Sequence, residues 1–204
     1  LYPRRGLELA EVMLRHFGVR GTILGEHRSK THSVLTELLR KYPEEIWLRI
    51  SDCLGPPIDE PAFVLKDWLR GEDDWGIEQE GALSLISKEA VWRWVDDDID
   101  SRAGYLASFV PKSLFCTEER TCWAREVLVR YGEREDVRRN LMGNFSTEGW
   151  TGPASLHFER KIQQLQDFRE GEDNENVRRW IDDYISRLNR QIELEKLREE
   201  RLEW

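Results

Sequence analysis

The sequence lacks any apolar run of about 18 residues, and no charged leader precedes an apolar stretch with a small-residue cleavage site. A membrane-spanning helix and a secretory signal are therefore not expected. Cysteine is scarce: the three, Cys53, Cys116 and Cys122, have spacings that match neither a disulfide framework nor a zinc site. We expect reduced, mostly buried thiols and a cytoplasmic protein.

Positive charge is also in short supply, because 31 Lys and Arg side chains stand against 40 Asp and Glu, for a formal net charge of −9. Residues 1–70 hold 11 basic and 10 acidic side chains, so the acidic excess belongs to the rest of the chain. Phosphate contacts need a surplus of Lys and Arg on one face, which argues against a general nucleic-acid binder. A local group of cations in the first part is better interpreted as a solvated loop: Arg15, Arg20, Arg28 and Lys30.

No segment shows the apolar–polar alternation of a half-buried strand. Apolar residues instead recur at helical spacing between short loops, so the predicted class is all-α. The predicted helices cover residues 6–17, 33–39, 43–50, 61–69, 80–86, 90–95, 105–109, 122–131, 136–141, 153–168 and the chain from 174 onward. Expected N-caps are Thr31 or Ser33, Ser87, Thr117, and Asp173 or Asn174, while Pro43, Pro61 and Pro153 open helices and Gly18, Gly71, Gly132 and Gly171 end them.

An internal repeat is the strongest signal. Residues 135–141 (Glu-Asp-Val-Arg-Arg-Asn-Leu) align with residues 175–181 (Glu-Asn-Val-Arg-Arg-Trp-Ile) at a shift of 40, with the Glu, the Val and both Arg identical. The frame around Val91 lies 46 residues before Val137 and matches moderately, and that around Ile46 lies a further 45 residues back and matches loosely. Such periods are typical of HEAT and armadillo arrays, in which each unit is a helical hairpin.

One hairpin cannot bury its apolar face alone, but stacked hairpins can. We therefore predict one domain over residues 1–204, a right-handed α-solenoid of HEAT-like hairpins, with approximate repeats at 30–71, 79–111, 117–145 and 153–204. Val137 and Val177 are expected at equivalent inward positions, and the Arg pairs beside them are expected to be exposed. Five tryptophans in apolar helical patterns are expected in the core: Trp47, Trp68, Trp94, Trp123 and Trp180.

The end of the chain carries a narrower resemblance. A loop at 145–155 containing Trp150, Gly152 and Pro153 precedes an amphipathic helix, the Asn176-Val177-Arg178-Arg179-Trp180 turn and a charged helix. This region is similar to the C-terminal region of large bacterial conflict or antiphage defence proteins, in which an NTPase or nucleotide-cleaving module is followed by helical repeats. The resemblance implies that any chemistry lies in another domain. The linker-like start at Leu1 also leads us to expect a domain excised from a longer protein.

No constellation for catalysis, a cofactor or a metal is predicted. Asp96, Asp98 and Asp100 sit at positions 1, 3 and 5 of an EF-hand loop, but Ser101 replaces the required Gly and Ala107 the bidentate Glu. His16, His27, His32 and His157 are scattered, and no signature supports Cys116 or Cys122 as a nucleophile. Gly18, Gly21 and Gly25 do not match a phosphate-binding loop.

The sequence favours a non-catalytic protein-interaction or sensing scaffold, a module of a larger cytoplasmic bacterial protein with a protein partner and no cofactor. The candidate partner-binding residues are Trp150, Arg138, Arg139, Arg178, Arg179, Asp97 and Asp98. The first alternative is a HEAT-like nucleic-acid-binding domain of the DNA-glycosylase type, which needs a basic concave groove with aromatic wedges. The second is a free-standing helical enzyme.

The last predicted helix changes character along its length. Ile181, Ile185, Leu188 and Ile192 form one apolar stripe suited to packing on the preceding helix. Beyond Ile192 the stripe breaks up among charged residues. We therefore expect the first half to be docked and the second half to project.

Overall fold

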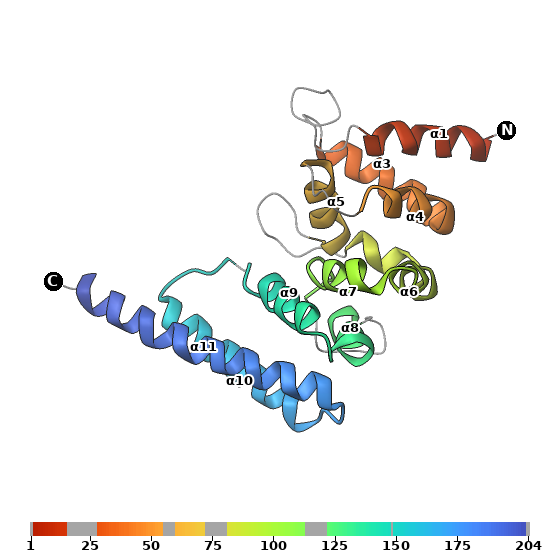
Figure 1. Ribbon diagram of the computed structural model, residues 1–204. Coiled ribbons are helices and arrows are strands. Elements are labelled where there is room, and N and C mark those ends of the chain that lie inside the picture. Colours follow the sequence, from red (N-terminus) through yellow and green to blue (C-terminus); the bar gives the residue numbers. More distant parts are fainter. Residues whose placement is uncertain are drawn as a thin grey trace. The chain divides into compact units, whose positions relative to one another are not determined.

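The computed structural model describes residues 2–15, 28–54, 60–71, 81–112, 122–147 and 149–202 (Figure 1). These ranges contain helices and turns and no strand, which confirms the predicted all-α class. The chain divides into two compact units, unit 1 (Leu1–Pro111) and unit 2 (Lys112–Trp204). Their boundary coincides with the end of the predicted repeat 79–111.

Unit 1 is a set of short helices: α1 (Tyr2–Arg15), α3 (Arg28–Lys41), α4 (Pro43–Asp52), α5 (Glu60–Arg70), the 3₁₀ helix η1 (Ala82–Leu85), α6 (Lys88–Asp96) and α7 (Ile99–Ala107). Helix α1 packs against α3 and α4, α4 packs against α6, and α6 packs against α7. Both α3 and α5 pack against η1. Buried apolar side chains from all of these helices form the core of this unit.

Several helix ends in unit 1 follow the expected signals. Pro43 opens α4, and the Ser87 side chain accepts a hydrogen bond from the Ala90 N–H at 3.2 Å as the N-cap of α6. The expected cap at Thr31 or Ser33 is wrong, because α3 begins at Arg28 and Thr31 is buried inside the helix. The expected cap was placed too late because Arg28-Ser29-Lys30, assigned to a loop, continues the helix without breaking it.

The predicted helix at 80–86 is present as the single 3₁₀ turn η1. Gly81, at its N-cap, lies against the last turn of α5. A Cβ atom at this position would stand 2.4 Å from the Leu69 carbonyl oxygen and 2.5 Å from that of Arg70. The chain can approach α5 this closely because residue 81 has no side chain.

Unit 2 contains α8 (Trp123–Tyr131), α9 (Glu135–Phe145), α10 (Ala154–Glu170) and α11 (Glu175–Leu202). Helices α10 and α11 form a long hairpin, and α8 packs against both α9 and α11 (Figure 1). Gly171 follows α10 as predicted. Asn174 caps α11, since its Oδ1 accepts hydrogen bonds from the backbone N–H groups of Asn176 (3.1 Å) and Val177 (3.2 Å).

The aligned segments of the repeat begin their helices in register. Glu135 and Glu175 are the first residues of α9 and α11. Val137 and Val177, two residues further on, are both 0% exposed. The two valines therefore occupy equivalent buried positions, as the shift of 40 residues predicts.

In both units a tryptophan side chain forms a hydrogen bond between two helices whose sequences align. In unit 1 the Trp47 Nε1 of α4 donates to the Ala90 carbonyl of α6 at 3.3 Å. In unit 2 the Trp180 Nε1 of α11 donates to the Arg138 carbonyl of α9 at 3.1 Å. In each pair the acceptor carbonyl lies near the start of its helix. The sequence of that helix aligns with the sequence of the helix that carries the tryptophan. The five tryptophans expected in the core are all buried, and Trp92, which had not been expected there, is buried as well.

The cysteines differ from one another. Cys53 is half-buried and its sulfur takes part in no disulfide, as expected. Cys122 is buried and disulfide-bonded, so the expectation of reduced thiols is wrong for Cys122. The spacing of the three cysteines carries no signal for this bond. The predictions made for Gly18, Cys116 and Thr117 lie outside the described residues.

Candidate interaction surface

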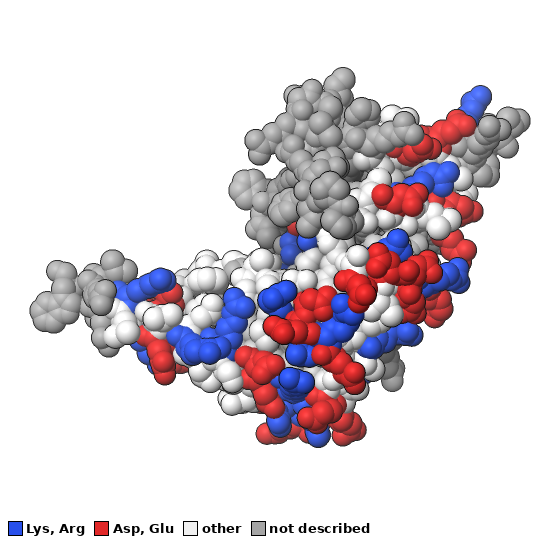
Figure 2. All heavy atoms as spheres, viewed as in Figure 1, with Lys and Arg blue, Asp and Glu red and all other residues white. Residues whose placement is uncertain are grey.

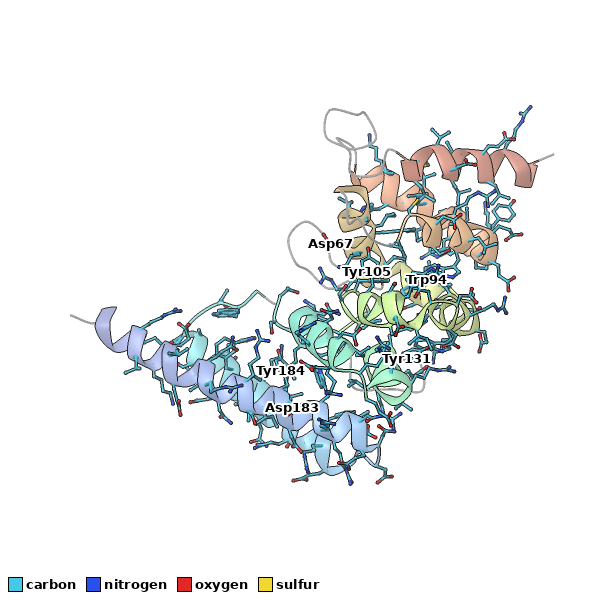
Figure 3. The ribbon with its side chains drawn as sticks, viewed as in Figure 1. Asp67, Trp94, Tyr105, Tyr131, Asp183 and Tyr184 are labelled. Atoms are coloured by element: carbon cyan, nitrogen blue, oxygen red, sulfur yellow. The ribbon has the colours of Figure 1, made fainter. Side chains whose placement is uncertain are left out.

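The loop between α9 and α10 is anchored at its first end by a capped helix terminus. The carbonyl oxygen of Phe145, the last residue of α9, accepts hydrogen bonds from the Tyr184 hydroxyl (3.0 Å) and the Lys161 ammonium (2.7 Å). The last carbonyls of a helix have no partner within it and favour a nearby cation. Tyr184, labelled in Figure 3, therefore fixes the start of the loop from α11.

The other end of the loop is fixed by a carboxylate from α11. Pro153, the N-cap of α10, makes no side-chain cap. Instead Glu199 accepts hydrogen bonds from the Ser155 N–H at 3.3 Å and from the Ser155 hydroxyl at 2.8 Å. A negative charge at a helix N-terminus is stabilising, because the first N–H groups have no partner in the helix.

Between these anchors Trp150 lies on the start of α10. Its indole stacks on the His157 ring, with ring centroids 5.1 Å apart and an angle of 14° between the planes. The indole also packs against the Phe158 ring, with centroids 5.5 Å apart. The side chain is nevertheless 45% exposed, and residues 149 and 151–153 around it are exposed too. Gly152 has a φ of +90°, a conformation that favours glycine. The loop thus presents an aromatic side chain whose orientation is set by local packing.

The two Arg pairs have divided roles. Arg138 donates to the carbonyls of Gly132 (2.6 Å) and Glu133 (2.8 Å), and the Nε of Arg178 donates to the carbonyl of Glu172. Each of these arginines reaches back to the residue six positions earlier, in the turn before its own helix. Both are half-buried, so the expectation of full exposure holds for the second member of each pair, Arg139 and Arg179.

The turn before α11 contains a buried charge that sequence reasoning missed. Glu172, 3% exposed, accepts two hydrogen bonds from Arg125 of α8, at 2.7 and 2.9 Å. Burial alone would raise the pKa of Glu172, but the bonds from Arg125 and from the Asn174 N–H outweigh it and hold that pKa below its ordinary value. Arg125 and Glu172 are 47 residues apart and share no local motif, so no sequence signal points to the pair.

Asp97 and Asp98, the acidic candidates, belong to unit 1. Asp98 is the N-cap of α7 and its Oδ1 accepts from the Ser101 N–H at 3.3 Å, whereas Asp97 is exposed at the end of α6. Trp150 and the four arginines belong to unit 2, so the candidate residues form two separate sets. Within the described ranges, no group of three or more His, Cys, Asp or Glu side chains is arranged to hold a metal ion.

Charge is mixed on the surface. In Figure 2 basic and acidic side chains alternate over the visible described residues, and no broad basic area stands out on this face. Several pairs join opposite charges at the surface, including Arg169–Asp182 at 2.5 Å and Lys196–Glu159 at 2.8 Å.

The second half of α11 is docked, contrary to expectation. Glu199 bonds Ser155 and Lys196 pairs with Glu159, so contacts to α10 continue well past Ile192. The prediction that the second half projects considered only the apolar stripe, which ends at Ile192. Beyond that residue, polar contacts with the N-terminal part of α10 hold the helix in place. Leu194 and Leu197 are 57% and 54% exposed.

The chain matches no known protein-family model, no curated protein and no solved structure. Across the part of the chain that the structure describes, every helix is too short or too polar to cross a membrane.

Proposed function

We propose that this chain is a non-catalytic, HEAT-like helical-repeat module of a larger cytoplasmic bacterial protein, and that it holds another protein through a surface centred on Trp150. The observation that carries the proposal is the exposed indole of Trp150, held against His157 and Phe158 on a loop fixed at both ends. Orienting a large aromatic side chain in advance removes part of the entropy cost of association, and tryptophan is enriched among residues that dominate binding energy.

The arrangement of helices supports the repeat part of the proposal. The in-register starts of α9 and α11, the buried Val137 and Val177, and the tryptophan bonds between aligned helices are what stacked hairpins require. In this proposal the α8–α9 and α10–α11 hairpins are successive units of a right-handed solenoid. The resemblance of residues 145–204 to defence proteins makes another domain of such a protein a candidate partner.

The arginines are reassigned within the proposed surface. Arg138 and Arg178 hold turns of the repeat, so their side chains are committed to backbone carbonyls. Arg139 and Arg179 are exposed and remain candidate partner contacts. Asp97 stays a candidate acidic contact in unit 1, while Asp98 is engaged in capping α7.

Site-specific photocrosslinking tests the proposal. A photoreactive amino acid at Thr151, beside Trp150, should crosslink to a protein in cells, and the same probe at Asp183, exposed on α11, is the matched control. The captured protein is then purified and its affinity measured. Trp150→Ala should weaken binding by about 30-fold, the equivalent of a 2 kcal/mol hot spot, with an unchanged circular dichroism spectrum.

Two results would count against the proposal. Equal affinity of the wild-type protein and Trp150→Ala for the purified partner would remove Trp150 from the interface. Crosslinking to nucleic acid, with salt-sensitive submicromolar binding, would favour the DNA-glycosylase-type alternative.

A further inference from the structure

The rings of His157 and Phe158 cover the Trp150 indole from one side only. The His157 ring stacks on the indole and the Phe158 ring packs against it, with centroid distances of 5.1 and 5.5 Å. The His157 and Phe158 centroids are themselves only 5.6 Å apart. Rings on opposite faces of an indole would stand roughly 10 Å apart, because each packs about 5 Å from its centroid. Neither ring therefore covers the indole face that points away from His157.

The same indole keeps a hydrogen-bond donor that the fold does not use. Trp47, Trp68 and Trp180 each donate from Nε1 to an oxygen on another helix. Within the described residues, the Trp150 Nε1–H donates to no protein group. The side chain is 45% exposed, and the uncovered face and the ring edge that carries Nε1 account for this exposure. A partner at Trp150 therefore meets an open aromatic face beside an available donor.

This combination of an open face and a donor favours an extended, proline-rich partner segment. The backbone carbonyls of a helix or a paired strand already accept hydrogen bonds within their own element, so such a partner would take water from the indole N–H without replacing it. A polyproline II segment has no internal hydrogen bonds, and its carbonyl oxygens are free to accept. Its proline rings dock on aromatic side chains, and because the segment is preformed it loses little conformational entropy on binding.

The charge of the chain favours a basic segment. The sequence has 31 Lys and Arg side chains against 40 Asp and Glu, for a formal net charge of −9. A surplus of one sign attracts partners of the opposite sign and speeds their association. Lysine or arginine residues beside the prolines would therefore steer such a segment toward this chain.

We propose that Trp150 recognises an extended, basic, proline-rich segment of its partner. A proline ring packs on the open face of the indole, and a backbone carbonyl of the segment accepts a hydrogen bond from the Trp150 Nε1–H. Flanking lysines or arginines supply the attraction to the acidic chain. This inference rests on the proposed role of Trp150 in holding another protein and adds the chemistry of the segment that is held.

The test titrates the full, isotopically labelled chain with a synthetic peptide that has a proline at every third position and an arginine at each end. In the nuclear magnetic resonance spectrum, the indole N–H signal that Trp150→Phe removes belongs to Trp150. We expect this signal to shift progressively and to saturate, while the signals of the buried tryptophans stay in place. A peptide with alanine for each proline should bind several-fold more weakly. A peptide with glutamate for each arginine should also bind more weakly, and added salt should reduce that difference.

Three variants locate the binding on the indole, with the affinity measured by fluorescence anisotropy of the labelled peptide. Trp150→Phe keeps an aromatic face but loses the donor, so it should bind about fivefold more weakly, typical of one lost hydrogen bond. Trp150→Ala loses both features and should bind more weakly still. Leu197→Ala removes a side chain of similar exposure, 54%, and should leave the affinity unchanged. An unchanged circular dichroism spectrum shows that each variant folds, and the comparison of peptides on the wild-type chain needs no variant.

Three results overturn the inference: no binding of the proline-rich peptide, equal binding of the alanine peptide, or equal losses in Trp150→Ala and Leu197→Ala. Equal binding of the glutamate peptide at low salt overturns the requirement for positive charge. The proposed function is decided separately. A partner that is captured at Thr151 and depends on Trp150, but whose crosslinked segment lacks proline, overturns this inference and leaves the proposed function intact. A captured partner whose affinity does not depend on Trp150 contradicts the proposed function itself.

Discussion

The turns before α9 and α11 share one hydrogen-bonding feature and differ in the side chains that they bury. In each, an arginine of the helix reaches back six residues to a backbone carbonyl, Arg138 to Gly132 and Arg178 to Glu172. The turn before α11 adds the buried side chain of Glu172, held by Arg125 of α8, whereas the residue 40 positions earlier is Gly132 and has no side chain. A Cβ at Gly132 would lie 2.2 Å from the Leu128 carbonyl oxygen, so this turn has no room for such a group.

The comparison shows why sequence identity across the repeat is a weak guide to a binding surface. The first arginine of each pair donates to backbone carbonyls at the same place in each turn, a structural role that does not depend on what the chain binds. The exposed Trp150 has no counterpart 40 residues earlier, because the residue at that position is the buried Val110. Residues without a counterpart 40 positions away, such as Trp150, are therefore better candidates for function than residues that recur.

The largest expected effect comes from removing the tryptophan–carbonyl hydrogen bond, of which each unit contains one. Trp180→Ala removes a fully buried indole and its bond to the Arg138 carbonyl, and should lower the free energy of unfolding by about 3–5 kcal/mol. Trp47→Ala, which removes the corresponding bond in unit 1, is the matched change. Urea denaturation followed by circular dichroism measures both. A loss below about 1 kcal/mol in either would contradict the role given to these tryptophans.

The buried charge of Glu172, found in the turn before α11 but not in the turn before α9, provides the second test. Glu172→Gln leaves the Arg125 guanidinium without its ionic partner, and because Arg125 is about one-third exposed we expect a loss of about 1–3 kcal/mol, less than for a fully buried pair. The folded pKa of Glu172 is lowered, so its contribution is present above the ordinary value of 4.5 and is lost as pH falls below it.

Thermal melts between pH 3 and pH 7 check this pH dependence. The wild-type protein should lose more stability across that range than Glu172→Gln does, in which this carboxyl no longer titrates. Parallel curves for the two proteins would show that the Arg125–Glu172 pair contributes nothing to stability.

The two arginines of a pair provide the next test. Arg138→Ala should cost about 1–2 kcal/mol, since it leaves the carbonyls of Gly132 and Glu133 without their donor. Arg139→Ala, one residue away and exposed, should change stability by no more than about 0.5 kcal/mol. Equal losses, measured by urea denaturation, would contradict the division of roles. The same contrast is expected between Arg178 and Arg179.

Features of the fold that depend on local chemistry were predictable from the sequence. Pro43, Ser87 and Asn174 start helices as expected, because proline geometry and cap bonds act within a few residues. The buried Val137 and Val177 follow from periodicity. The solenoid arrangement itself stays a prediction.

Contacts between distant residues were not predictable in this way. The Arg125–Glu172 pair, the Lys161 bond to the Phe145 carbonyl and the Glu199 cap of α10 join residues that only the packed helices bring together. Trp150 was proposed from its place in a loop, and its exposure agrees with that proposal. Its stack on His157, seven residues along the chain, depends on the path of the loop into α10.

The smallest expected effect concerns the end of α11. The apolar stripe ends at Ile192, and beyond it polar contacts hold the helix against α10. Glu199→Gln keeps the shape of the side chain and one acceptor oxygen but removes the negative charge from the α10 N-terminus. We expect a loss of about 0.3–1 kcal/mol, typical of a charge at a helix end. Lys196→Met, which breaks an exposed pair with Glu159 one turn earlier, should have no measurable effect on unfolding. Added salt should weaken the Glu199 contribution, so the wild-type and Glu199→Gln melting curves should converge as ionic strength rises. Identical stability of the two proteins at low salt would mean that Ser155 and the first turn of α10 do not depend on this carboxylate, and that the last turns of α11 project as the sequence alone suggests.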